Sequence, residues 1–300
     1  MAKIVECIPN FSVARDRVVL YELQAAAKSV PGVTLLDCAP DDSHNRTVLT
    51  LVGDPEGIKA VAVKLARFAA EKIDLTKHSG EHPRMGAMDV CPFVPLKGVT
   101  MEECVEISKE VGAAISSEAG IPVFLYEDSA ASEGRRNLAA IRKGEFEGMA
   151  EKMTQPQWQP DFGGARPHPT AGVVAVGARM PLVAFNVNLS TSDINIANSI
   201  AKVVRGSSGG FKYCKAIGVM LEDRNIAQVS MNMVNYEGTP IYRVVEAIRA
   251  EARRYGVSVA GTELIGLAPA KALVDCAEYY LQIEKFDYAK QVLENHILGN

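Results

Sequence analysis

The chain has 300 residues, of which 48% are hydrophobic and 23% charged, the balance of a globular protein with room for two domains. Its formal net charge is -4 and both signs are interspersed, so neither a basic nucleic-acid-binding block nor an acidic disordered tail is indicated. The most apolar stretch, 171–185, contains Arg179 and Pro181, which excludes it as a membrane span.

In the first half of the chain, apolar patterns alternate between the periods of strands and helices. Helices are predicted over 16–30, which Pro31 and Gly32 end, and from Pro55 to about 73. Strands are predicted at 4–8, 33–38, 47–52 and 90–96. The resulting order is β-α-β-β-α-β. A helix over 101–119, a strand over 122–126 and a shorter helix over 135–143 extend it.

The second half repeats this order of elements. Strands are predicted at 182–189, 215–221, 226–234 and 257–264, and helices at 194–205 and 241–255. Asp193 is placed to cap the first of these helices, and Gly256 to end the second. Further helices are expected from 269 onward. We therefore predict an α+β protein with two ferredoxin-like βαββαβ subdomains, over 1–178 and 179–300.

The six cysteines include no C-x-x-C pair, which is typical of reduced thiols rather than of a disulfide framework. The first residues contain no apolar run long enough for a secretion signal. We expect a cytoplasmic protein with no membrane and no nucleic-acid partner. The segment 154–172, rich in Pro, Gly and Gln, fits either an interdomain linker or a loop that closes over a ligand.

The densest polar cluster spans 78–86. Gly80 and Pro83 make a helix unlikely there, so His78 and His82 should not share a helical face, and we predict no metal site. His82 is the better candidate for a general base, and Arg84 could hold a carboxylate through two parallel hydrogen bonds. Either Glu81 or Asp89 could set the tautomer of His82. The alternative is a surface loop whose polar residues are simply solvated.

Two other segments bear on function. In the cluster 41–46, Asn45 and Arg46 could point along the following strand into the same cleft, or the cluster could be a turn that starts that strand. The segment 205–210 resembles a phosphate cradle, but it follows a helix and lacks the Gly-Lys-Ser/Thr ending, which favours a flexible loop. No G-x-G-x-x-G or G-x-S-x-G occurs, which argues against a dinucleotide-binding Rossmann domain and a serine hydrolase.

A set of short motifs runs through the chain. They are Val5-Glu6-Cys7-Ile8-Pro9-Asn10-Phe11-Ser12, Asn45-Arg46-Thr47, Gly80-Glu81-His82-Pro83-Arg84-Met85-Gly86-Ala87, Cys91-Pro92-Phe93, Pro122-Val123-Phe124-Leu125-Tyr126, Asp161-Phe162-Gly163, Ala184-Phe185-Asn186-Val187-Asn188-Leu189 and Ala227-Gln228-Val229-Ser230. Together they closely resemble the formiminotransferase domain, which in animals is the N-terminal part of formiminotransferase-cyclodeaminase. The resemblance covers essentially the whole chain and is strongest to the stand-alone bacterial form.

This resemblance implies two subdomains with facing sheets, a substrate cleft between them, and a homodimer. It implies tetrahydrofolate as co-substrate, N-formimino-glutamate as donor, and His82 as the catalytic histidine. It also favours the interpretation of 154–172 as a loop that closes over a ligand, because the folate-binding stretch of the family falls within it. That stretch comprises Gly163, Gly164, Ala165, Arg166, Pro167, His168, Pro169, Thr170, Ala171 and Gly172. The chain ends at Asn300 with no cyclodeaminase domain, so a separate cyclodeaminase is expected to act downstream.

Two departures from the family pattern stand out. Val13 and Ala14 replace the Glu-Gly that usually follows Asn-Phe-Ser. Ala39 stands where many members carry an acid thought to assist the histidine. Either that role lies elsewhere, or it passes to one of three nearby acids, Asp37, Asp41 and Asp42.

The chemistry of formimino transfer indicates which kinds of residue the site needs. The folate amine must lose a proton as it attacks, and the leaving nitrogen must gain one, which one imidazole can do near neutral pH. We expect Arg46 and Arg84 to bind substrate carboxylates, and Asn10, Asn186 or Arg84 to stabilise the tetrahedral intermediate. Two alternatives stay open: a formyltransferase that uses N-formyl-glutamate, and a non-catalytic folate-binding paralogue.

Overall fold

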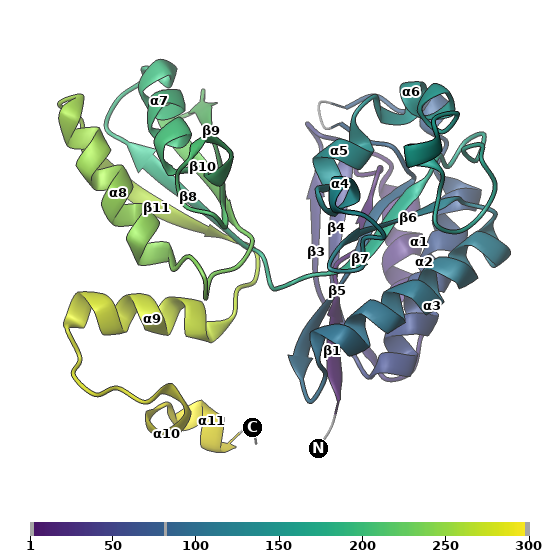
Figure 1. The fold of residues 1–300 in the computed structure, drawn as a ribbon, viewed down its shortest axis with the longest axis horizontal. Coiled ribbons are helices and arrows are strands. Elements are labelled where there is room, and N and C mark those ends of the chain that lie inside the picture. The colour runs from purple at the N-terminus through teal and green to yellow at the C-terminus, as the bar shows by residue number, and fades with distance from the viewer. Residues whose placement is uncertain (1–2, 81–82, 298–300) are drawn as a thin grey trace. The chain divides into compact units, whose positions relative to one another are not determined.

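A computed structural model describes residues 3–80 and 83–297 of the chain (Figure 1). The chain forms two compact units that divide after Arg179. Each unit has its own β-sheet and its own hydrophobic core. The prediction of an α+β fold with two ferredoxin-like subdomains is confirmed by the strand order within each sheet.

The sheet of unit 1 contains the ferredoxin-like order with two strands added at one edge. Its strands are β1 (Ile4–Cys7), β2 (Asn10–Phe11), β3 (Val33–Asp41), β4 (Arg46–Gly53), β5 (Met88–Lys97), β6 (Val123–Glu127) and β7 (Val174–Ala178). Both β1 and β2 lie between β4 and β5, so they act as one interrupted strand, and β3 pairs with the outer side of β4. These pairings are antiparallel, whereas β7 pairs in parallel with both β5 and β6.

Strand β7 was not predicted from the sequence. All five of its residues are buried, so it lacks the alternation of polar and apolar side chains that marks a half-exposed strand. Its sequence, Val-Ala-Val-Gly-Ala, also contains no strong β-former other than valine. Only the pairing with two parallel neighbours identifies it.

Helices cover both faces of this sheet. On one face, the main core of unit 1 is built by α1 (Arg17–Lys28), α2 (Pro55–Lys72) and α3 (Met101–Ala119). On the other, a smaller core is built by α5 (Leu138–Arg142) and α6 (Glu145–Lys152), which follow α4 (Glu133–Arg136). The single helix predicted over 135–143 is thus two short helices that meet at Asn137. Two 3-10 turns, η1 (Leu75–Lys77) and η2 (Pro156–Trp158), lie in the connecting segments.

Unit 2 repeats the plan without added strands. Its strands β8 (Val183–Leu189), β9 (Cys214–Leu221), β10 (Ile226–Met233) and β11 (Val259–Ile265) form an antiparallel sheet in the order β11-β8-β10-β9. Its core is shared with α7 (Ile194–Val204) and α8 (Ile241–Arg254). The 3-10 turn η3 (Gly206–Ser208) follows α7, and the chain continues through α9 (Ala270–Leu281), α10 (Tyr288–Gln291) and α11 (Leu293–Ile297).

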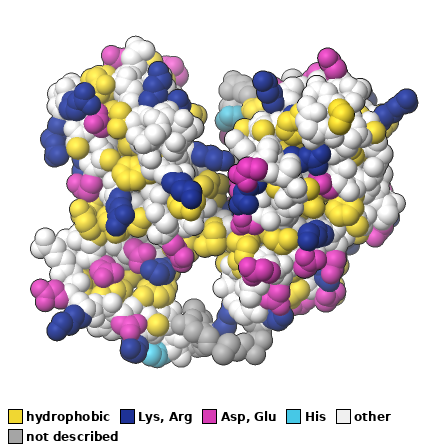
Figure 2. Space-filling model, viewed as in Figure 1, with side chains coloured by type: hydrophobic (Ala, Val, Ile, Leu, Met, Phe, Trp, Pro, Cys, Tyr) yellow, Lys and Arg dark blue, Asp and Glu magenta, His cyan; other side chains and the backbone are white. Residues whose placement is uncertain are grey.

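The visible surface carries acidic and basic side chains in mixture, with neither sign gathered into one large patch (Figure 2). This agrees with the interspersed charges of the sequence. Among the described residues, no helix is both long and apolar enough to cross a membrane.

A short backbone pairing ties the segment after the polar cluster to the segment before β7. The N–H of Val173 donates to the carbonyl of Met85 at 3.0 Å, and the N–H of Ala87 donates to the carbonyl of Ala171 at 2.9 Å. The central residues of this antiparallel bridge are two glycines, Gly86 and Gly172. The pairing therefore joins the segment that leads into β5 to the segment that leads into its neighbour β7.

Glycine is required on both sides of this bridge. A Cβ on Gly86 would lie 2.0 Å from the carbonyl oxygen of Val173, and a Cβ on Gly172 would lie 2.1 Å from that of Met85. Gly172 also has a φ of +69°, a conformation that other residues adopt only at a cost. A side chain at either position would push the two segments apart.

We expect Gly172→Ala to destabilise the protein by more than about 2 kcal/mol, since it combines left-handed strain with a backbone clash. Gly164→Ala, in the same loop, is the matched control, because a Cβ there meets nothing within 4 Å. Urea unfolding of both variants would measure the difference. Equal stability of the two variants would contradict the proposed need for glycine at position 172.

Candidate functional site

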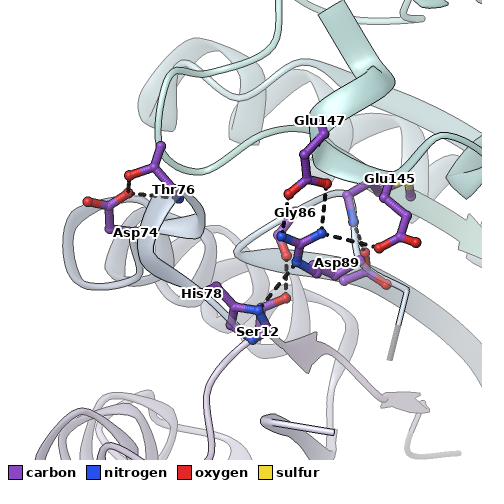
Figure 3. A network of polar contacts seen from close by, with 10 residues as sticks. Ser12, Asp74, Thr76, His78, Gly86, Asp89, Glu145 and Glu147 are labelled. Atoms are coloured by element: carbon purple, nitrogen blue, oxygen red, sulfur yellow. Dashed lines mark hydrogen bonds and ion pairs between the residues drawn. The ribbon is translucent and has the colours of Figure 1, made fainter. Parts of the chain in front are cut away.

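The polar cluster at 78–86 lies where three loops of unit 1 come together. Residues 81 and 82, and with them the predicted base His82 and its neighbour Glu81, lie outside the described residues. The residues on either side are described and are held firmly. After the gap, the hydroxyl of Ser12 donates to the carbonyl of Gly86 at 2.8 Å, and the N–H of Met85 donates to Asp89 Oδ1 at 2.8 Å (Figure 3).

The side chain of Asn45 joins the loops before the gap. Its Oδ1 accepts from the N–H groups of Ala14 and Arg15 at 2.9 and 3.2 Å, and its Nδ2 donates to the carbonyl of Ser79 at 3.1 Å. Asn45 has a φ of 48°, which asparagine tolerates better than most residues. A Cβ on Gly80 would lie 2.3 Å from the carbonyl oxygen of His44. The structure therefore brings together two polar clusters that are separate in the sequence, since Asn45 and Ser79 are 34 positions apart.

Arg84, predicted to bind a substrate carboxylate, is engaged by carboxylates of the protein itself. Its Nη1 and Nη2 donate to the two oxygens of Glu147 at 2.8 and 2.6 Å, and Nη1 also reaches Glu145 at 3.2 Å (Figure 3). These hydrogen bonds with Glu147 raise the pKa of Arg84, although partial burial opposes them. Substrate binding by Arg84 stays a prediction. It would require a substrate carboxylate to replace the carboxylates of α6 as the partner of Arg84. No local pattern in the sequence pointed to either glutamate, because both lie more than 60 residues further along the chain.

His78 is held in one tautomer. Its Nε2 lies 3.0 Å from the carbonyl oxygen of Asn45, which can only accept, so Nε2 carries the proton. Its Nδ1 accepts from Arg84 Nε at 3.3 Å (Figure 3). Burial lowers the pKa of His78, the bond to Asn45 opposes this, and the charge of Arg84 lowers the pKa further. His78 is therefore a neutral positioning group rather than a poised acid.

Asn10 and Arg46 lie side by side on the face of the sheet that α1, α2 and α3 leave uncovered. Arg46 Nη2 donates to Asn10 Oδ1, and Asn10 Nδ2 donates to the carbonyl of Ile8 at 2.8 Å. Burial lowers the pKa of Arg46; the charge of Asp89 opposes this and that of Arg142 adds to it. The structure thus brings these two predicted substrate-binding residues into contact.

Asp89, considered as a partner for His82, is fully occupied by other groups. Its Oδ1 accepts from Met85 N–H, and its Oδ2 accepts from Arg142 Nη2 at 2.6 Å. Asp89 is 2% exposed, so this ion pair is shielded from water. Sequence reasoning missed Arg142, which stands in a short helix with no motif around it. Its role as the counter-ion of Asp89 depends on contacts between residues 53 positions apart.

Ala39, which stands where many relatives carry an acid, lies on the same sheet face as Arg46. In the β3–β4 register Ala39 pairs with Val48 and Asp41 pairs with Arg46. Asp41 itself receives hydrogen bonds from His44, with its Oδ2 2.6 Å from Nδ1, and these lower the pKa of Asp41 although burial opposes them.

Of the other two acids considered as replacements, Asp42 pairs with Arg17 at 2.6 Å. Asp37 lies two residues before Ala39 in β3, and so on the same face, and it pairs with Thr50. Asp37 and Asp41 thus share the face of Ala39, and the assignment of the assisting role among them stays a prediction.

The predicted folate-binding stretch, 163–172, begins and ends in fixed conformations. Gly163 has a φ of +95°, and a Cβ there would lie 2.7 Å from Ser116 Oγ. The backbones of His168 and Gly172 exchange hydrogen bonds at 2.8 and 2.9 Å, and His168 Nδ1 accepts from Ala171 N–H at 3.0 Å. Between these anchors, residues 163–166 are exposed. Because the stretch ends in the bridge to Gly86, it lies next to the polar cluster.

Asn186, the remaining predicted residue, belongs to unit 2. It lies in β8 between Ser230 of β10 and Glu263 of β11, on the sheet face opposite α7 and α8. That face carries a hydrogen-bonded set that sequence reasoning did not single out. Asn188 Nδ2 donates to Glu263 at 2.8 Å, and Gln228 Nε2 donates to Asn188 at 2.7 Å. The alternation of Asn186 and Asn188 in an apolar strand was the one available signal.

Comparison with known families identifies the chain. Residues 4–179 match the model of the formiminotransferase domain, N-terminal subdomain, and residues 184–296 match that of the formiminotransferase domain. The chain belongs to the formiminotransferase family. The resemblance found in the sequence motifs is thereby confirmed.

Relatives in this family extend over the whole chain. The glutamate formimidoyltransferase of Streptococcus pyogenes serotype M1 is 67% identical over 299 residues, covering 100% of both chains. The Thermoplasma acidophilum protein of the same name is 45% identical and covers 95% of this chain and 94% of its own. The formimidoyltransferase-cyclodeaminase of Gallus gallus is 46% identical over 95% of this chain, which spans 54% of the length of that relative.

The lowered pKa of His78 predicts a pH-dependent loss of stability. Because the folded protein disfavours the imidazolium, the unfolded chain binds this proton more readily, and stability falls as the pH drops through about 6.5. Replacing His78 by Gln should remove this part of the pH dependence. Unfolding measured from pH 8 to pH 5 should show a smaller loss for His78→Gln than for the natural protein. Parallel curves would show that His78 does not titrate differently in the folded state.

Proposed function

We propose that the protein is a glutamate formimidoyltransferase, which transfers the formimino group of N-formimino-L-glutamate to N5 of tetrahydrofolate. The products are 5-formimino-tetrahydrofolate and L-glutamate. The observation that supports this most strongly is the 67% identity, over the full length of both chains, to the Streptococcus pyogenes glutamate formimidoyltransferase.

The catalytic step assigned to His82 follows from the chemistry of the reaction. As N5 attacks the formimino carbon, it must lose a proton, and the glutamate nitrogen must gain one as it leaves. A single imidazole near its ordinary pKa can accept the first proton and donate the second. Holding two substrates together would supply much of the rate.

The remaining roles are proposals of the same kind. His82 would be the catalytic histidine, and Asn186 would be a substrate-binding residue. The exposed residues 163–166 would contact tetrahydrofolate, the co-substrate. We place the enzyme in the cytoplasm, in histidine degradation and one-carbon metabolism. It would act as a homodimer, with a separate cyclodeaminase consuming its product.

No metal is needed for this chemistry, because the formimino carbon is already electrophilic and the proton transfers can be made by an imidazole. Within residues 3–80 and 83–297, no group of three or more His, Cys, Asp or Glu side chains is arranged to hold a metal ion.

The purified protein should form 5-formimino-tetrahydrofolate from tetrahydrofolate and N-formimino-glutamate, followed by the absorbance of the folate product. N-formyl-glutamate at equal folate is the comparison, since it differs from the donor only by O in place of NH. Turnover with N-formyl-glutamate alone would reassign the protein as a formyltransferase. Turnover with neither donor, while folate still binds, would make it a non-catalytic folate-binding paralogue.

We expect His82→Ala to lower turnover by about 10²-fold or more while the protein stays folded, because the proton would lose its acceptor. His296→Ala, a histidine in α11 of unit 2, is the matched control and should keep normal turnover. Steady-state kinetics and thermal unfolding of both variants would test this. Near-normal turnover in His82→Ala would remove His82 from the catalytic role.

A further inference from the structure

Four residues of unit 1 form a half-buried polar set, which we call the Arg46–Arg142 set. Arg46 contacts Asn10, and Arg142 contacts Asp89. The two pairs adjoin because Asn10 pairs with Val90, the residue next to Asp89, in the β2–β5 register. Residues from β2, β4, β5 and α5 thus converge on one place (Asp89 is labelled in Figure 3).

Both guanidiniums in this set have hydrogen-bonding capacity to spare. The Nε atoms of Arg46 and Arg142 are buried and have no hydrogen-bond partner, and they are the only such side-chain atoms within the described part of the chain. A buried N–H without a partner is unfavourable, and folded proteins rarely leave one unless a ligand or function requires it. This pair of vacant donors is therefore concentrated at a single place.

Other part-buried arginines of unit 1 show what a purely structural guanidinium looks like. Arg135 donates through Nε, Nη1 and Nη2 to the carbonyls of Gln157 and Gln159 and to Asp161. Arg84 likewise uses Nε, Nη1 and Nη2. In both, all three nitrogens are occupied, whereas Arg46 and Arg142 each have a buried nitrogen left over.

The Arg46–Arg142 set contains two guanidiniums and one carboxylate, Asp89, whose two oxygens accept from Arg142 and from the backbone of Met85. The next carboxylate, Asp41, pairs with Arg46 across β3 and β4, but it is exposed and both its oxygens are bonded to His44. Arg84, by contrast, faces two carboxylates. An excess positive charge in a half-buried place is stabilised by a bound anion, and a planar carboxylate matches the geometry of a guanidinium.

The set can be reached from solvent. The side chain of Arg142 is 14% exposed, and Arg46 is also partly exposed. The set also adjoins the proposed chemistry, since Asp89 binds the backbone of Met85, which follows the Gly-Glu-His-Pro-Arg run. A ligand bound here would lie close to that run.

We propose that Arg46 and Arg142 together bind a carboxylate group of a substrate, with Asn10 and Asp89 positioning the two guanidiniums. This inference rests on the proposed function, in which the donor and the folate tail both carry glutamyl carboxylates. The inference adds Arg142 as a binding residue. It also makes Arg46 and Arg142 the main carboxylate-binding site of unit 1, because the guanidinium nitrogens of Arg84 already have partners within the protein.

The test replaces Arg142 by Gln, which removes the charge, and by Lys, which keeps a charge beside Asp89 but lacks Nε. The matched control is Arg136→Gln, which breaks an exposed pair with Asp128. We expect Arg142→Gln to raise the KM for one substrate by about tenfold or more, because a charge-assisted hydrogen bond is lost. The KM for the other substrate, and both values in Arg136→Gln, should change by less than about twofold.

The substrate whose KM changes identifies the source of the carboxylate. A rise for N-formimino-glutamate assigns the pair to the donor. A rise for tetrahydrofolate assigns it to the folate tail, and in that case tetrahydropteroate, which lacks the glutamyl group, should be used equally well by the natural protein and the variant.

A purely structural role would give a different result. In that case Arg142→Gln would lower the melting temperature, or it would leave both KM values within about twofold of those of the natural protein. Either outcome overturns the proposal, unless Arg142→Lys raises one KM by at least about threefold while the melting temperature stays unchanged. If the natural protein shows no turnover, the proposed function fails separately. Calorimetric binding of L-glutamate and of 5-formyl-tetrahydrofolate then decides: the proposal requires that one of them bind and that Arg142→Gln weaken it.

Discussion

The short backbone bridge between Met85–Ala87 and Ala171–Val173 is the constraint on which the rest of unit 1 depends. It attaches the segment after the polar cluster to the strand β7, which in turn extends the ferredoxin-like sheet by parallel pairing with β5. Because the two segments pass so close to each other, only glycine fits at positions 86 and 172. The same bridge brings the end of the proposed folate-binding stretch next to the proposed catalytic loop.

Around this bridge, charged side chains divide into two kinds. Arg84 and Arg135 have all their guanidinium nitrogens occupied by protein acceptors, and so they hold loops and helices together. Arg46 and Arg142 keep unused donors in a half-buried place. A ligand gains the most binding free energy where buried donors have no partner within the protein. It gains the least where every donor already has one.

Local patterns in the sequence were sufficient for most of the fold. The cap at Asp193, the start at Pro55 and the end at Gly256 are short-range signals that act within one helical turn, and the structure has helix ends at each of these places. Strand β7 could not be predicted in this way, because a strand buried on both faces shows no alternation. The helix predicted over 135–143 is interrupted at Asn137, whose side chain caps the second piece.

The sequence by itself determined the order of elements in both units, the motifs that mark the family, and the two polar clusters around Asn45 and His78. These rest on interactions between near neighbours and on residue types that chemistry requires. Only the tertiary structure decided which charged groups meet. Arg84 meets Glu147 across 63 positions, Arg142 meets Asp89 across 53, and Arg46 meets Asn10 across 36. The packing of helices on the sheet decides which partners meet. No local pattern encodes whether the donors of an arginine find acceptors within the protein or stay available to a ligand.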